Sequence, residues 1–71
     1  MERIPVDSSN LASIGYDVAS FTLEVEFING TIYQYSGVPE NEYNGLMSAS
    51  SKGSYLNQQI KKAGYPYTRV C

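Results

Sequence analysis

Cations and tyrosines are interleaved in the last third of the chain, and together they could bind a nucleotide. Residues 51–71 contain no acid and seven such side chains, namely Lys52, Lys61, Lys62, Arg69, Tyr55, Tyr65 and Tyr67. The first fifty residues contain all seven acids of the chain and one cation, Arg3. A cation binds phosphate and an aromatic ring stacks on a base, so this combination is typical of nucleotide or nucleic-acid binding.

The composition argues against catalysis. The chain has no histidine and one cysteine, Cys71, so it has neither a zinc-type ligand set nor a Ser-His or Cys-His pair. Its seven carboxylates are spread along the sequence, with no spacing that forces two of them together as an acid/base pair. We therefore expect a binding protein and not an enzyme, with no catalytic residue, metal site or cofactor.

A candidate phosphate site comprises Ser51, Lys52 and Gly53, at the predicted start of a helix. Unpaired backbone N–H groups, a lysine and a residue without a side chain together suit an anion. An alternative stays open, in which Ser51 only caps the helix, Gly53 permits close packing and Lys52 is solvated. The longer spacing of a nucleotide-hydrolase phosphate loop is absent, so we predict no ATPase activity.

The other candidate ligand contacts are tyrosines, an asparagine and an arginine. They are Tyr33, Tyr35, Tyr55, Asn57, Tyr67 and Arg69. The asparagine either reads a base edge or only fastens a loop. We expect Tyr67 and Arg69 near the basic face, because alternation along an extended segment exposes one side chain and buries the next.

Alternation of apolar and polar residues predicts the strands that position these side chains. Residues 21–27 alternate in the manner of a half-buried strand. Asn29-Gly30 tolerates positive φ, so residues 21–36 are predicted to form a hairpin, and a strand over 11–16 in front of it makes a meander.

Two registers of this hairpin place its tyrosines differently. A two-residue turn pairs Phe27 with Ile32 and turns both tyrosines towards the acids of the preceding strand. A three-residue turn with Gly30 as a bulge pairs Phe27 with Thr31, turns the tyrosines towards the core and exposes Ile32. We expect the bulged register because it keeps the amide of Gln34 outside, and the tyrosines then reach a pocket only with their hydroxyls.

Two short helices are expected after Gly37-Val38-Pro39 stops the sheet. Glu40 and Glu42 follow Pro39, and acids are stabilising at this position because the N-terminal end of a helix dipole is positive. A second helix is predicted to begin after Ser50 or Ser51 and to run to Lys62 or Ala63, with Gly64 as its stop.

Residues 65–70 are β-prone, and Pro66 near their start is typical of an edge strand. The predicted fold class is therefore α+β, with a small antiparallel β-meander of three to four strands followed by two short helices and a C-terminal edge strand.

Length and charge fit one domain, residues 1–71. A chain this short buries a small core, so we expect a homo-oligomer that hides further apolar surface. We expect no membrane contact, because no apolar run is long enough to span a bilayer and residues 1–6 do not resemble a secretory leader. The lone cysteine fits a reducing compartment, and the expected location is cytoplasmic.

An ordered series of short motifs resembles a known family. The motifs are Ser8-Ser9-Asn10, Ile14-Gly15-Tyr16-Asp17, Leu23-x-Val25-x-Phe27, Asn29-Gly30, Tyr33-Gln34-Tyr35, Val38-Pro39, Ser51-Lys52-Gly53-x-Tyr55-x-Asn57 and Tyr65-x-Tyr67. Over residues 6–70 the chain is similar to the KTSC domain, which is also found at the C-terminus of some lysyl-tRNA synthetases. The resemblance implies a small domain that also occurs as a free-standing protein, with RNA as a suggested partner.

Three kinds of ligand remain open at this point. A small nucleotide needs only one or two phosphates neutralised, which suits a chain of net charge −2 and pI ≈ 4.8, and such a protein could act by sequestering its ligand. RNA is the alternative that the resemblance suggests, although nucleic-acid domains usually carry a basic excess. A protein partner is the third, bound through the C-terminal edge strand, residues 65–70, or through an apolar patch containing Ile32.

Overall fold

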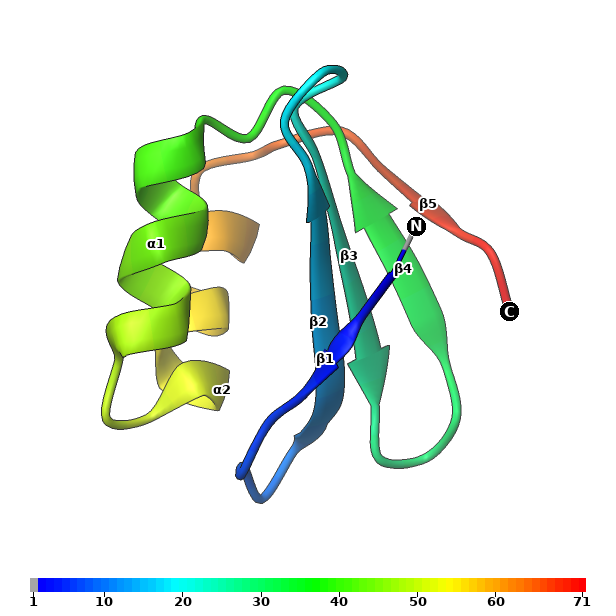
Figure 1. Cartoon of the computed structure of the whole chain (residues 1–71), viewed down its shortest axis with the longest axis vertical. Coiled ribbons are helices and arrows are strands. Elements are labelled where there is room, and N and C mark those ends of the chain that lie inside the picture. Colours follow the sequence, from blue (N-terminus) through cyan, green and yellow to red (C-terminus); the bar gives the residue numbers. More distant parts are fainter. Residues whose placement is uncertain (1) are drawn as a thin grey trace.

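Five antiparallel strands form one sheet in the order β1-β2-β3-β4-β5 in the computed structural model, which describes residues 2–71. The strands are β1 (Ile4–Pro5), β2 (Leu11–Asp17), β3 (Thr22–Phe27), β4 (Ile32–Tyr35) and β5 (Tyr67–Arg69). Between β4 and β5 come α1 (Glu40–Ser48), α2 (Lys52–Tyr55) and the π-helix η1 (Leu56–Lys61). All three helices lie on one face of the sheet (Figure 1). The predicted α+β class is confirmed.

The β3–β4 hairpin adopts the bulged register. Val25 is paired with Tyr33 and Leu23 with Tyr35. The Phe27 amide donates to the Thr31 carbonyl at 2.8 Å, and Gly30 has a φ of 93°, as the glycine of a bulged three-residue turn requires. The hairpin therefore directs its two tyrosines to the helix-covered face. Ile32, expected to be exposed, is half-buried instead.

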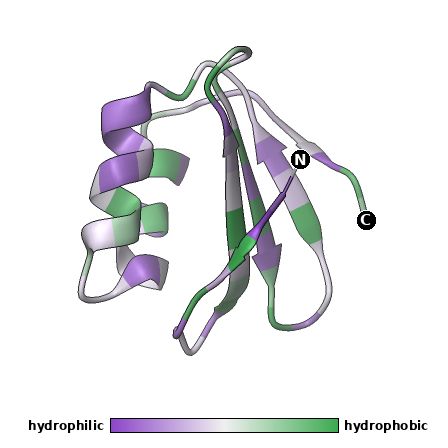
Figure 2. Ribbon diagram, in the orientation of Figure 1, coloured by the Kyte–Doolittle hydropathy of each residue, from purple (hydrophilic) through white to green (hydrophobic). Residues whose placement is uncertain are grey.

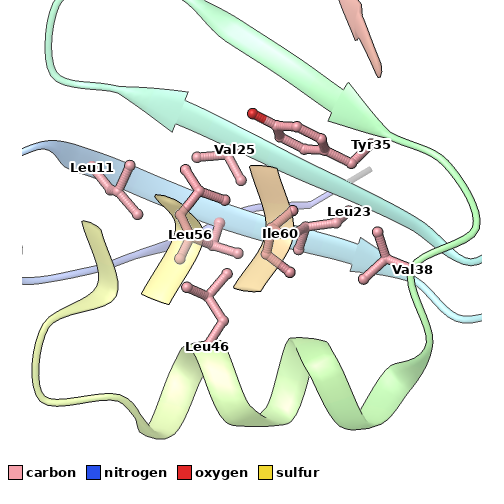
Figure 3. Close-up of a cluster of buried hydrophobic side chains, with 9 residues drawn as sticks. Leu11, Leu23, Val25, Tyr35, Val38, Leu46, Leu56 and Ile60 are labelled. Atoms are coloured by element: carbon pink, nitrogen blue, oxygen red, sulfur yellow. The ribbon is translucent and has the colours of Figure 1, made fainter. Parts of the chain in front are cut away.

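The core lies between this sheet face and the helices. Its buried side chains are Leu11, Ile14, Leu23, Val25, Tyr35, Val38, Leu46, Leu56 and Ile60. In Figure 3, Leu46 of α1 points towards the sheet, with Leu56 and Ile60 of η1 beside it. Burying such a side chain contributes about 1.5–3 kcal/mol, so this cluster fixes the helices on the sheet.

The second helical segment begins as predicted, ends at Lys61, one residue before the predicted end at Lys62 or Ala63, and changes type within its length. Ser51 is the N-cap and accepts a hydrogen bond from the Ser54 amide, and Gly64 has a φ of 81° after the last turn. From Leu56 the segment continues as a π-helix, which the sequence did not predict.

The first turn of α1 is hydrophilic (Figure 2), and Glu40 and Glu42 lie in it.

The outer face of the sheet carries a polar network that holds the short strand β1, which was not predicted either. The Arg3 guanidinium forms an ion pair with Glu24 and donates from Nε to the Ser13 hydroxyl at 2.9 Å. Gln34 Nε2 donates to the second oxygen of Glu24 at 2.7 Å. Glu24 is only 6% exposed, so its charge is buried with partners on both sides.

Candidate functional site

Four tyrosines line a cleft of ≈ 410 Å³ beside the edge strand β5. We call it the tyrosine cleft, and its lining residues are Tyr33, Tyr35, Lys61, Gly64, Tyr65 and Tyr67. They come from three elements that are distant in sequence, namely β4, the end of η1 with the loop after it, and β5. The volume falls within the range of small-molecule sites, about 300–1,000 Å³.

Strand pairing brings the tyrosines of β4 and β5 together. Tyr35 is paired with Tyr67, and Tyr33 with Arg69, so that each pair lies on one face of the sheet. The Tyr67 ring centroid lies 5.8 Å from that of Tyr33 and 5.9 Å from that of Tyr35. Tyr67 is 67% exposed, which leaves an aromatic surface open to a planar ligand.

Two phenols of the cleft, those of Tyr35 and Tyr65, have a raised pKa. Burial raises the pKa of Tyr35, and the neighbouring phenols of Tyr33 and Tyr67 act in the same direction. Burial also raises the pKa of Tyr65, whose hydroxyl lies 3.5 Å from a carboxylate oxygen of Glu42. The Tyr35 hydroxyl could therefore donate a hydrogen bond to a ligand without carrying charge, whereas the Tyr65 hydroxyl donates to Glu42.

Lys61 supplies a positive charge at the cleft. Its Nζ lies 5.3 Å from the centroid of the Phe27 ring, a cation–π contact that places the ammonium over this aromatic face. Phe27 also makes an edge contact with Tyr33, with ring centroids 5.9 Å apart. Arg69 lines neither cleft described in this section. It is paired with Tyr33, and its Nε donates to the Cys71 carbonyl at 2.9 Å.

The predicted phosphate site at Ser51 and Lys52 is engaged in local structure. The Ser51 hydroxyl accepts from the Ser54 amide at 3.4 Å, and Lys52 Nζ donates to the Ala49 carbonyl at 3.3 Å. Gly53 is buried, and a Cβ there would lie 2.8 Å from the side-chain nitrogen of Asn10. These contacts favour the alternative of capping and close packing, and Ser51 and Lys52 line neither cleft described in this section.

Tyr55 is also separated from the tyrosine cleft. Its hydroxyl donates to Glu42 Oε1 at 2.7 Å, and its ring lies against Gly45 of α1. The hydrogen bond to Glu42 and burial both raise the pKa of Tyr55. Its contacts join α1 to α2.

Gly53 and Asn57 border a second cleft, of ≈ 400 Å³. We call it the amide cleft because Asn10, Asn29 and Asn57 all line it, together with Phe27 and Lys61. Lys61 thus lines both clefts. Of the nine predicted ligand contacts, Tyr33, Tyr35 and Tyr67 meet in the tyrosine cleft, whereas Gly53 and Asn57 lie in the amide cleft.

The sequence interpretation assigned no ligand contact to Lys61 or Tyr65. Cations in the last turn of a helix commonly stabilise the helix dipole. This structural role explains Lys61 without a ligand, so the sequence did not indicate that Lys61 lies between two clefts. The signal available was the Tyr65-x-Tyr67 motif close after Lys61-Lys62, which joins aromatic and cationic groups within one short segment.

Residues 2–71 contain neither a cluster of side chains able to hold a metal ion nor a helix of the length and apolarity needed to cross a membrane.

This chain is similar to a family model and to known proteins. The KTSC domain model matches residues 7–65. A protein of Stutzerimonas stutzeri is 41% identical over 70 residues, which cover 99% of both chains. A lysine–tRNA ligase of Nostoc punctiforme is 34% identical over 55 residues, 78% of this chain but 10% of the ligase.

A solved structure has the same fold along nearly its whole length. The crystal structure of a KTSC domain protein from Yersinia pestis superposes with a TM-score of 0.90 at 41% sequence identity, covering 99% of this chain and 97% of that one. The ordered motifs, the matched family model and this superposition agree. The chain belongs to the KTSC domain family.

Proposed function

We propose that this protein binds a small nucleotide-type ligand in the tyrosine cleft. The observation that carries the proposal is that Tyr33, Tyr35, Tyr65, Tyr67 and Lys61 line one cavity of ≈ 410 Å³. The base stacks on the exposed ring of Tyr67, and its phosphate pairs with Lys61. Arg69, which is paired with Tyr33 at the same sheet edge, is the second cation for the phosphate.

The energetics of this arrangement suffice for specific binding. One base–aromatic stack contributes about 1–3 kcal/mol, and one hydrogen bond to a charged group contributes about 1.5–3 kcal/mol. Two of each offset the cost of ordering the ligand and reach roughly micromolar affinity. The net charge of −2 does not oppose this, because only one or two phosphates need neutralising.

Sequestration is the biological role that fits such a site. The side chains that line the tyrosine cleft are four phenols and an ammonium, which suit binding better than hydrolysis or group transfer. Tyrosines of raised pKa, such as Tyr35 and Tyr65, are poor bases at neutral pH. We propose that the protein holds its ligand without transforming it, in the cytoplasm and as a homo-oligomer.

A matched pair of lysines tests the proposal. Lys61→Gln removes the cation of the cleft, whereas Lys62→Gln removes the adjacent exposed cation, which lines neither cleft. In calorimetric titration with a panel of nucleotides, we expect Lys61→Gln to weaken binding at least about tenfold, the value of one charged hydrogen bond. Equal losses in both variants, or no heat with any nucleotide, would reject the tyrosine cleft as the site.

RNA is a second candidate because the Nostoc relative is named a lysine–tRNA ligase. The exposed aromatic ring of Tyr67 could serve an unstacked base of RNA equally well. However, the chain has only five cations, and Arg3 is paired with Glu24 on the opposite face of the sheet. This supply of charge supports few phosphate contacts, so the small ligand is preferred.

A protein partner is favoured by one further feature. β5 is an edge strand, and Tyr67 and Val70 are 67% and 47% exposed beside its unpaired backbone. A partner that adds a strand there would use backbone hydrogen bonds and would not depend on Lys61. Capture of a partner that survives Lys61→Gln, in a protein that binds no nucleotide, would favour this role.

A further inference from the structure

The amide cleft is not used by a single nucleotide held between the tyrosines. It has nearly the same volume as the tyrosine cleft, ≈ 400 Å³, but a different lining. Asn10, Asn29 and Asn57 bring three amides to it, and the ring of Phe27 forms part of its wall. An amide offers both a donor and an acceptor, as the edge of a base requires.

Two of these amides are available to a ligand. The hydrogen bonds formed within residues 2–71 do not use the side-chain amide of Asn10 or of Asn57. Asn29 is committed in part, because its Oδ1 accepts from the Thr31 amide at 3.0 Å. Asn10 is fixed in place, since its side chain lies against Gly53 and its carbonyl accepts from the Ile28 amide at 3.0 Å.

Lys61 joins the two clefts. It lines both of them, and the Phe27 ring beneath its ammonium also contacts Tyr33 of the tyrosine cleft. Asn57 and Lys61 are four residues apart on η1, and both line the amide cleft. A cation between two base-sized cavities lies where a linking phosphate would be.

We infer that the ligand is a dinucleotide, with one base in the tyrosine cleft, the other in the amide cleft and a linking phosphate at Lys61. The inference rests on the proposed function and names its ligand class. The two hydrogen-bonding environments differ, so the clefts select their bases differently. The base among the tyrosines is held by stacking, and the base among the asparagines is read at its edge.

Asn57→Ala separates this inference from nucleotide binding in general. Asn57 is exposed and lies within a helical segment, so alanine preserves the fold, and the adjacent exposed Gln58→Ala is the matched control. Calorimetry compares nucleoside monophosphates with linear and cyclic dinucleotides made from the same bases. Thermal unfolding of each variant verifies that it is folded.

We expect a linear or a cyclic dinucleotide to bind the unmodified protein at least tenfold more tightly than either parent monophosphate. Asn57→Ala removes that advantage and leaves monophosphate affinity unchanged, Lys61→Gln weakens both ligands, and Gln58→Ala changes neither. If a monophosphate binds as tightly as every dinucleotide, or if Asn57→Ala weakens both ligands equally, the inference is wrong while the proposed function stands. If no nucleotide of either kind binds, both are wrong.

Discussion

At the scale of single residues, Lys61 and Glu24 show two opposite uses of charge in one small domain. The Lys61 ammonium lies over an aromatic ring at the boundary of two clefts and stays accessible to a ligand. Glu24 is buried on the other face of the sheet, where it is neutralised by Arg3 and hydrogen-bonded by Gln34. Charge on one face is available for binding, and charge on the other face stabilises the fold.

The buried pair predicts acid sensitivity. Burial of Glu24 opposes its ionisation, but hydrogen bonds from Gln34 and Arg3 and the charge of Arg3 outweigh burial and lower its pKa below the ordinary value of 4.5. A lowered folded-state pKa contributes stability that is present above the unfolded-state pKa and lost as pH falls through the folded-state pKa. We expect the free energy of unfolding to decline in this acid range.

Urea titrations at a series of pH values measure this effect. Glu24→Gln should flatten the decline below pH 4.5, whereas Asp7→Asn, at an exposed carboxylate, should leave its slope unchanged. At neutral pH, Arg3→Met leaves the buried carboxylate without its counter-charge and should cost about 2 kcal/mol. An unchanged acid slope in Glu24→Gln would contradict the role given to this pair.

Single residues also show how far the sequence could predict the site. Gln34 sufficed to choose the hairpin register, because only the bulged register keeps its amide out of the core. Gly30 supplies a positive φ in either register. Lys61 could not be distinguished from Lys62, since both lie at the end of the same helical segment. Their difference arises from Phe27, which is distant in sequence.

At the scale of elements, the strands with clear alternation were predictable and the short or irregular elements were not. β1 has two residues, Ile4 and Pro5, and is held by the Arg3 network and by pairing with β2. These contacts are with residues distant in sequence, so no local sequence pattern predicts this strand. The π-helix η1 was missed because its buried residues, Leu56 and Ile60, also fit α-helical spacing.

Packing between α1 and α2 gives a prediction at this scale. Alanine usually stabilises a helix relative to glycine, by about 1 kcal/mol. At Gly45, however, a Cβ would lie 2.9 Å from Cζ of Tyr55, whose hydroxyl is held by Glu42. Because overpacking costs about 1–3 kcal/mol, we expect Gly45→Ala to destabilise the protein by about 1 kcal/mol.

Chemical denaturation compares Gly45→Ala with Asn44→Ala, a change at the neighbouring exposed position of α1. The control should be neutral or slightly stabilising. Tyr55→Leu should remove the conflict, so that adding Gly45→Ala to it costs less than adding it to the unmodified protein. A stabilised Gly45→Ala protein would show that the two helices are not packed through this contact.

At the scale of the whole molecule, the tyrosine cleft exists only because the chain returns to the sheet after its helices. β4 supplies Tyr33 and Tyr35, and β5 returns Tyr67 to them some thirty residues later. The sequence indicated which residue types could bind a ligand, but their division between two clefts depends on this long-range pairing. Ser51 and Lys52, also predicted as ligand contacts, form local hydrogen bonds and line neither cleft.

The distribution of charge predicts a weak dependence of binding on salt. A ligand with one or two phosphates releases few counterions, so its affinity should fall less than about tenfold between 50 mM and 200 mM salt. RNA bound through many phosphates would lose far more over the same range. A loss well above tenfold in calorimetric titrations would favour RNA as the ligand.

The measurement that tests nucleotide binding at the tyrosine cleft most directly is amide chemical-shift mapping by NMR, for which a chain of 71 residues is well suited. On addition of a nucleotide that gives heat in calorimetry, we predict that the largest shifts fall on Tyr33, Lys61, Gly64 and Tyr67. Shifts confined to Ser51, Lys52 and Gly53 would contradict this placement and restore the phosphate site predicted at that helix start. Absence of shifts with the entire nucleotide panel would contradict nucleotide binding itself.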